Sequence, residues 1–156
     1  KLDDMPVEDI MTPKSVIFAL VESDTVGKVI DTHSPIAFSR IPVYQKDLDN
    51  ITGIVNRYTL VNKQAEDQFD IKIKNLMNPI HSIIEKTSVS DVLDLFVKRR
   101  EQMFIVTDDF GTTTGLITLE DAIETLLGVE IVDEHDHVID MRKLASAKLK
   151  QQNLTK

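Results

Sequence analysis

Apolar residues along this chain fall into two kinds of pattern, helical spacing and short strand-like runs. At 89–97 they recur at intervals of three and four, which predicts an amphipathic helix that Ser88 or Ser90 can cap. The runs at 40–44 and 103–107 are mostly apolar and contain β-branched residues, which predicts strands. The chain therefore mixes helices with strands, and we predict an α/β fold.

The order of these patterns occurs twice, which indicates an internal repeat. Residues 7–13, Val-Glu-Asp-Ile-Met-Thr-Pro, are similar to residues 73–79, Ile-Lys-Asn-Leu-Met-Asn-Pro, 66 positions later. Two further pairs of segments match in the same order, at offsets of 63 and 62 positions: 41–43 with 104–106, and 51–55 with 113–117. We interpret the chain as two tandem units of one kind, with small deletions that shift the offset.

Each unit is predicted to have the element order β-α-β-β-α. In the first unit we expect a strand at 15–20, a helix at 25–32, strands at 40–44 and 53–56, and a last helix. In the second we expect a strand at 82–84, the helix from 89, strands at 103–107 and 115–118, and a helix from Leu119 that Gly128 ends. The polar stretch 62–70 is predicted to join the units.

The domain boundaries follow from the repeat. Residues 1–70 are assigned to the first unit with its lead-in and linker, 71–136 to the second unit, and 137–156 to a C-terminal tail that we expect to be mobile. The two units are expected to pack through their sheets with approximate twofold symmetry.

The composition excludes several classes of function. The 156-residue chain contains no cysteine, which excludes disulfides, cysteine–zinc sites and a thiol nucleophile. Its formal net charge of −8 and its 5% aromatic content argue against nucleic-acid binding. The longest apolar run, 16–21, is far too short for a membrane span, so we expect no membrane insertion of this chain. The sequence shows no Gly-rich phosphate loop, Gly-x-Ser-x-Gly or His-Glu-x-x-His, and we predict that it is not an enzyme.

Two polar segments each have two interpretations. Thr118-Leu119-Glu120-Asp121 is a capping box at a helix start, and the same geometry presents free N–H groups and a positive helix end to a phosphate. A carboxylate there can also accept hydrogen bonds from both ribose hydroxyls. The segment 134–137, Glu-His-Asp-His, is either a divalent-cation site or a solvated acidic linker. We favour the linker and predict no metal site.

Several motifs in order resemble a known family. They are Glu-Asp-Ile-Met-Thr-Pro at 8–13, Phe-Ser-Arg-Ile-Pro-Val-Tyr at 38–44, and Gly-Leu-Ile-Thr-Leu-Glu-Asp at 115–121, which runs on to the acidic segment 130–134. Together they resemble a tandem pair of CBS domains, also called a Bateman module, over residues 7–136. More narrowly they resemble the pair of the CorC/CNNM family of magnesium and cobalt efflux, often described as hemolysin-like. In that family the pair lies on the cytoplasmic side of the cell membrane, attached to a transmembrane transporter domain.

The resemblance implies a site for an adenine nucleotide between the two units. ATP is favoured over AMP, with Mg²⁺ as an optional companion ion. By this resemblance Thr118 and Asp121 hold phosphate and ribose. Arg40 clamps the phosphates and Phe38 contacts the base. Further contacts are implied at Thr12, Ile80 and Ile105.

We therefore expect a regulatory module that senses an adenine nucleotide and biases an attached magnesium or cobalt transporter, as a homodimer of such pairs. The first unit carries Asn-Arg-Tyr-Thr at 56–59, which lacks the carboxylate, so one nucleotide site per pair is predicted. The same loss leaves open a ligand-free structural dimerisation module. A divalent-cation sensor at 134–137 is the second alternative.

Overall fold

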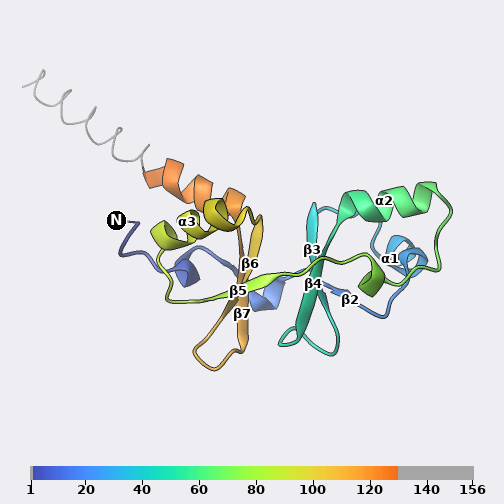
Figure 1. Cartoon of the computed structure of the whole chain (residues 1–156), viewed down its shortest axis with the longest axis horizontal. Coiled ribbons are helices and arrows are strands. Elements are labelled where there is room, and N and C mark those ends of the chain that lie inside the picture. Colours follow the sequence, from blue (N-terminus) through green and yellow to red (C-terminus); the bar gives the residue numbers. More distant parts are fainter. Residues whose placement is uncertain (1, 130–156) are drawn as a thin grey trace, which may run out of the picture.

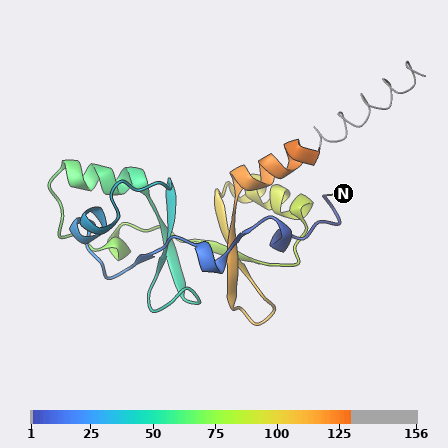
Figure 2. The same cartoon turned by 180° about the vertical axis from the view of Figure 1, so that it is seen from behind.

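The computed structural model describes residues 2–129 as two α/β units that lie side by side along the long axis of the molecule (Figure 1). The strands of both units lie near the middle, and α1 and α3 lie toward opposite ends (Figures 1 and 2). The predicted tail at 137–156 and the segment 134–137 lie outside the described residues.

The first unit contains the helices α1 (Val26–His33) and α2 (Arg57–Ala65) and a three-stranded sheet. The side chain of Thr25 begins α1 by accepting a hydrogen bond of 3.2 Å from the backbone N–H of Lys28. The strands pair first parallel and then antiparallel, in the order β2 (Leu20–Val21), β3 (Arg40–Tyr44) and β4 (Ile51–Asn56).

The second unit contains α3 (Val89–Arg99), a further helix at 119–129 and a four-stranded sheet. Of the two serines considered as caps of α3, Ser88 accepts a hydrogen bond of 3.0 Å from the backbone N–H of Asp91. The strands lie in the order β1 (Thr12–Pro13), β7 (Thr113–Thr118), β6 (Met103–Thr107) and β5 (His81–Ile84).

The lead-in of each unit packs against the other unit. Val7 is fully buried in the core of the second unit, and Ile73 is fully buried in the core of the first. Thr12 pairs with β7, and its equivalent Asn78 exchanges two backbone hydrogen bonds of 2.8 Å with Ile54 of β4. The two crossings obey the same approximate twofold relation, which confirms the predicted fold of two pseudosymmetric units.

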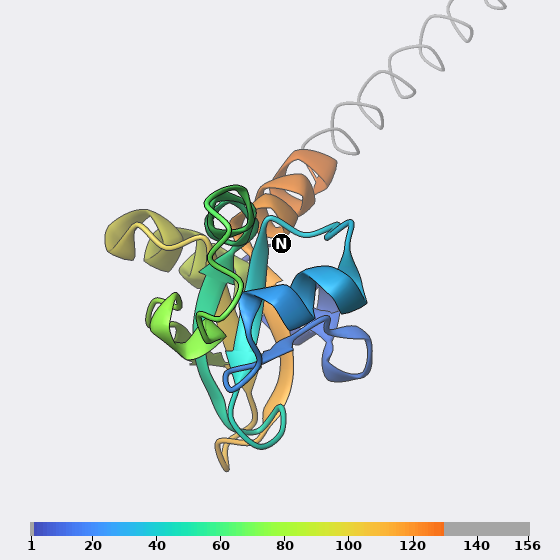
Figure 3. The same ribbon diagram turned by 90° about the vertical axis from the view of Figure 1, so that its right-hand side faces the viewer.

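A small apolar cluster joins the two sheets. It contains Met103, Ile105 and Leu116 from the second unit, all less than 10% exposed. Ile51 and Ile54 of the first unit pack against them. Viewed along the long axis, the strands of the two units lie one behind the other (Figure 3). The predicted packing through the sheets is thus present.

The strand predicted at 15–20 is wrong. Lys14–Val16 form a 3₁₀ turn, and in this stretch only Leu20 continues into a strand that pairs with β3. Pro13 lies 66 positions before its equivalent in the second unit. Leu20 lies only 63 positions before its equivalent, as the matching strand pairings of the two residues show. The turn is therefore an insertion in the first unit, and its apolar residues are not strand residues.

Two predicted boundaries are also wrong. Gly128 and the residue after it are still helical, so Gly128 does not end the last helix. A glycine weakens a helix but ends it only where a left-handed conformation is needed, and Gly111 is the glycine with positive φ in the described chain. In the first unit, α2 extends to Ala65 and so occupies part of the stretch 62–70 that was predicted as linker.

Candidate functional site

A cavity of about 550 Å³ lies between the two units at the start of the helix at 119–129. We call it the Thr118 cavity. Its lining comes from segments of both units that are far apart in the sequence. Five of the seven residues implied by the family resemblance line it: Thr12, Phe38, Arg40, Thr118 and Asp121.

The end of β7 positions Thr118 and Asp121. Thr118 is the last strand residue, and its hydroxyl oxygen accepts a hydrogen bond of 3.2 Å from the backbone N–H of Asp121. The interpretation of this segment as a helix cap is therefore confirmed. A hydroxyl that accepts can still donate its own proton, and among the described residues that proton has no protein acceptor. Capping and ligand binding are therefore compatible roles for Thr118.

The lead-in of the first unit brings Thr12 to the same cavity. Thr12 and Pro13 pair with Leu116 and Gly115 of β7. A Cβ atom on Gly115 would lie 2.4 Å from the carbonyl oxygen of Thr12, so only glycine permits this close crossing. The Met-Thr-Pro segment can therefore pair with β7 at this point only because β7 has a glycine there.

Arg40 is held at the cavity by the start of β3. Its Cα pairs with that of Asn56 at the end of β4. Its Nη1 atom lies 3.5 Å from Oε1 of Glu120, and the two side chains are 29% and 56% exposed. Glu120 also lines the cavity, and sequence reasoning did not include it in the site. Its position in the sequence, between Thr118 and Asp121, could have indicated that it reaches the same cavity.

Phe38 presents an aromatic face beside this ion pair. Its side chain is 53% exposed, and its ring stacks on that of Phe18 with centroids 5.8 Å apart and planes at 22°. Both rings line the Thr118 cavity. Because one face of Phe38 is covered by Phe18, the ring is supported in a position from which it can stack on a flat ligand.

Ile80 and Ile105 do not line the Thr118 cavity. Ile105 is 4% exposed within the cluster between the sheets. Ile80 packs against the same cluster and lines a different cavity. The structure therefore brings the five polar and aromatic candidates together, and it places the two isoleucines elsewhere.

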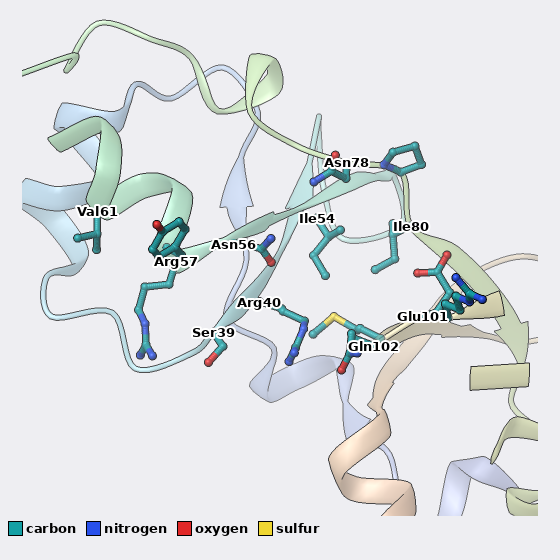
Figure 4. A pocket seen from close by; sticks show the side chains of 14 residues that line it. Ser39, Arg40, Ile54, Asn56, Arg57, Val61, Asn78, Ile80, Glu101 and Gln102 are labelled. Carbon is teal, nitrogen blue, oxygen red and sulfur yellow. The ribbon is translucent and has the colours of Figure 1, made fainter. Parts of the chain in front are cut away.

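A second cavity, of about 650 Å³, lies at the start of α2 (Figure 4). We call it the Asn56 cavity, because Asn56 has the place of Thr118 there, without a side-chain cap. Arg57 donates a hydrogen bond of 2.9 Å to the carbonyl of Ile36. Glu101 is the carboxylate that lines this cavity, and it comes from the segment before β6. The start of α2 therefore presents no carboxylate to the cavity. The prediction of one nucleotide site per pair stays a prediction.

Residues 2–129 contain no helix that is long and apolar enough to cross a membrane. In the same part of the chain, no group of three or more histidine, aspartate and glutamate side chains is arranged to hold a metal ion.

Three comparisons with known proteins bear on the fold and the family. Residues 73–128 match the family model of the CBS domain. The magnesium and cobalt efflux protein CorC of Salmonella typhimurium strain LT2 is 34% identical over 144 residues, which cover 91% of this chain and 49% of that protein.

Two solved structures are similar over most of the chain. The CBS domain of a bacterial CNNM/CorC family Mg²⁺ transporter in complex with ATP is 30% identical with a TM-score of 0.76, over 81% of this chain and 90% of that one. A CBS-domain pair from Klebsiella pneumoniae with bound AMP is 26% identical with a TM-score of 0.70, over 79% of this chain and 98% of that one.

The repeat, the lead-in segments that each pack against the other unit, and these similarities define the class of protein as a tandem pair of CBS domains. This chain belongs to the CBS-domain modules of the CNNM/CorC family of Mg²⁺ transporters. The family resemblance drawn from the sequence motifs is therefore confirmed. The chain spans about half the length of CorC.

Proposed function

We propose that this chain is a regulatory module that binds an adenine nucleotide in the Thr118 cavity. The observation that carries this proposal is the convergence of Thr118, Asp121 and Arg40 on one cavity beside a helix N-terminus, together with Thr12 and Phe38. The ATP and AMP in the two similar structures support the class of ligand. ATP is favoured, with Mg²⁺ as its companion ion.

The phosphate end of the ligand lies at the start of the helix at 119–129. There the backbone N–H groups of the first turn and the positive end of the helix dipole favour an anion. The hydroxyl of Thr118 donates its free proton to a phosphate oxygen. The guanidinium of Arg40, at the edge of the same cavity, adds charge-assisted hydrogen bonds from the other unit.

The nucleoside end is recognised by Asp121 and Phe38. An ionised carboxylate accepts hydrogen bonds only, so Asp121 suits the two hydroxyls of a ribose. Phe38, supported by Phe18, stacks on the base. Thr12 completes the wall on the side of the first unit's lead-in. Ile80 and Ile105 keep the sheets together behind this site and are left out of it.

The module acts by binding and not by catalysis. A ligand that bridges Arg40 of one unit and Thr118 of the other favours one arrangement of the two units, because only that arrangement offers all its contacts. In the full-length protein, the shift of the two units toward that arrangement biases a membrane transporter for magnesium or cobalt. The module accordingly lies on the cytoplasmic side of the membrane.

A ligand-free dimerisation module is the second candidate. Tyr58 and Val61 on α2 are exposed, as are Ile123 and Leu127 on the helix at 119–129. Both helices lie on the same side of the molecule (Figures 1 and 3). Exposed apolar side chains grouped in this way favour contact with a second copy, and we propose that the module is a homodimer through this side.

The first experiment is a thermal-shift titration of the purified chain with AMP, ADP and ATP, each with and without Mg²⁺. A ligand at about 100 times its Kd stabilises the folded state by about 2.7 kcal/mol. For a chain of this size that raises the Tm by about 5–10 °C. We expect this shift with ATP and its loss in Asp121→Ala, which removes the acceptor for ribose.

Thr59→Ala is the matched control, because Thr59 has the place of Asp121 in the first unit and lines neither cavity. It is expected to keep the full ATP shift. If no nucleotide up to millimolar concentration raises the Tm, nucleotide binding is ruled out and the dimerisation module remains.

A further inference from the structure

The segment 34–39, which joins α1 to β3, carries Phe38 to the Thr118 cavity and has no regular secondary structure. Ile36 is buried in the core of the first unit, and the other five residues of the segment are exposed. A segment of this kind lacks the backbone hydrogen bonds by which a helix or strand fixes the direction of its side chains. The position of Phe38 therefore depends on contacts with other elements.

Arg57, at the start of α2, supplies such contacts. Its backbone N–H donates a hydrogen bond of 2.9 Å to the carbonyl of Ser39, and its Nη1 atom donates one of 2.9 Å to the carbonyl of Ile36. Among the described residues, these two hydrogen bonds join the backbone from 35 to 39 to the rest of the chain. The side chain of Arg57 extends from α2 toward the segment that contains Ser39 (Figure 4). The two acceptors flank Phe38 in the sequence, so one arginine holds the backbone on both sides of the ring.

Arg57 does not line the Thr118 cavity itself. It lines the Asn56 cavity, so its effect on a ligand beside Phe38 must pass through the segment 34–39. The second unit has no equivalent of this contact, because Leu119 has the place of Arg57 there and packs against the core.

We propose that Arg57 is a positioning residue for the Thr118 cavity, which holds Phe38 where it can stack on the base of the ligand. This inference rests on the proposed nucleotide site. The ring of Phe38 already stacks on Phe18 with one face, and Arg57 fixes the backbone that carries it. The helix start of the first unit, which lacks a carboxylate for a ribose, thus serves the cavity at the helix start of the second.

The test compares Arg57→Gln with the wild-type chain in calorimetric titrations with ATP. Glutamine is too short to keep the bond to Ile36, and the backbone bond to Ser39 remains. We expect the Kd for ATP to rise about three- to tenfold, the range of one aromatic stacking contact. Arg57→Lys keeps a donor of similar reach and should recover part of the loss.

Lys63→Gln is the matched control for charge, since Lys63 lies on the same helix, forms an ion pair only with Glu66 among the described residues, and lines neither cavity. It should leave the Kd for ATP unchanged. Ser88→Ala is the control for stability, because it removes the cap of α3 away from the cavity. It should likewise leave the Kd unchanged.

A double-mutant cycle with Phe38→Ala gives the readout that a merely structural role would not produce. If Arg57 acts through the ring, Arg57→Gln should have little further effect once the ring is absent. A general loss of stability or of positive charge would weaken ATP binding equally in both backgrounds, and that result would overturn the inference.

The remaining outcomes separate this inference from the proposed function. Failure of the wild-type chain to bind any nucleotide overturns both. If the wild type binds ATP and Arg57→Gln binds it with the same Kd, the bond to Ile36 does not position Phe38, and the inference alone is overturned.

Discussion

Two glycines allow the chain to cross itself at the centre of the molecule. A Cβ on Gly115 would lie 2.4 Å from the carbonyl oxygen of Thr12, and one on Gly53 would lie 2.7 Å from that of Asn78. Both distances are far below any real carbon–oxygen contact. The glycine and the Met-x-Pro segment therefore recur together in both units for one reason: the segment crosses the strand so closely that only glycine fits there.

Gly115→Ala is expected to lower the free energy of unfolding by about 1–3 kcal/mol, the usual cost of overpacking. It should also weaken ATP binding, because β1 must shift and Thr12 shifts with it. Urea unfolding and calorimetric titration measure the two effects. Gly128→Ala is the control: a Cβ there meets nothing within 4 Å, and alanine should stabilise the helix by up to about 1 kcal/mol. If both variants were equally stable, the close crossing would not be the reason that glycine is required at position 115.

At the scale of elements, the two helices of the second unit begin with the same device. The hydroxyl oxygens of Ser88 and Thr118 each accept a hydrogen bond from the backbone N–H three residues later, at 3.0 and 3.2 Å. Only Thr118 lies at the cavity. The two caps therefore provide an internal comparison between stabilising a helix and binding a ligand.

Thr118→Ala and Ser88→Ala should each lower the free energy of unfolding by about 1 kcal/mol through the lost cap. Only Thr118→Ala should also raise the Kd for ATP, since only that hydroxyl donates to the phosphate. Thr118→Ser keeps a hydroxyl and is expected to restore both properties. Melting curves with and without ATP give both readouts. An unchanged Kd in Thr118→Ala would limit this residue to capping.

The sequence predicts elements well where the apolar period is long, as in α3. Ser88 was one of its two predicted caps, and Val89, Val92 and Phe96 are buried as their spacing predicts, although Val97 on the same predicted face is 77% exposed. The prediction fails at 15–20, because an apolar run of that length does not distinguish a buried strand from an inserted 3₁₀ turn. The cavity was predicted in part. The family resemblance implied that Thr118, Asp121 and Arg40 lie at one site. Spacing could not show which isoleucine faces the cavity, nor that Glu120 reaches Arg40 across the units.

At the scale of the whole molecule, the two units are not independent. Each core contains residues from the other unit's lead-in, as Val7 and Ile73 show. A third apolar cluster lies between the sheets. Because loss of one unit exposes buried surface of the other, we expect the pair to unfold as a single cooperative body.

Val7→Ala tests this cooperation directly. Val7 precedes the whole first unit in the sequence but is fully buried in the core of the second. Its truncation should cost about 2 kcal/mol through the lost methyl groups and the cavity they leave. In urea, a single transition should move to lower midpoint with an unchanged m-value. Hydrogen exchange should report lower protection in β3 and β4 as well as in β6 and β7, because a cooperative body opens as a whole. Lost protection in β6 and β7 alone would show that the units unfold separately, and a ligand bound between them would then act by holding them together.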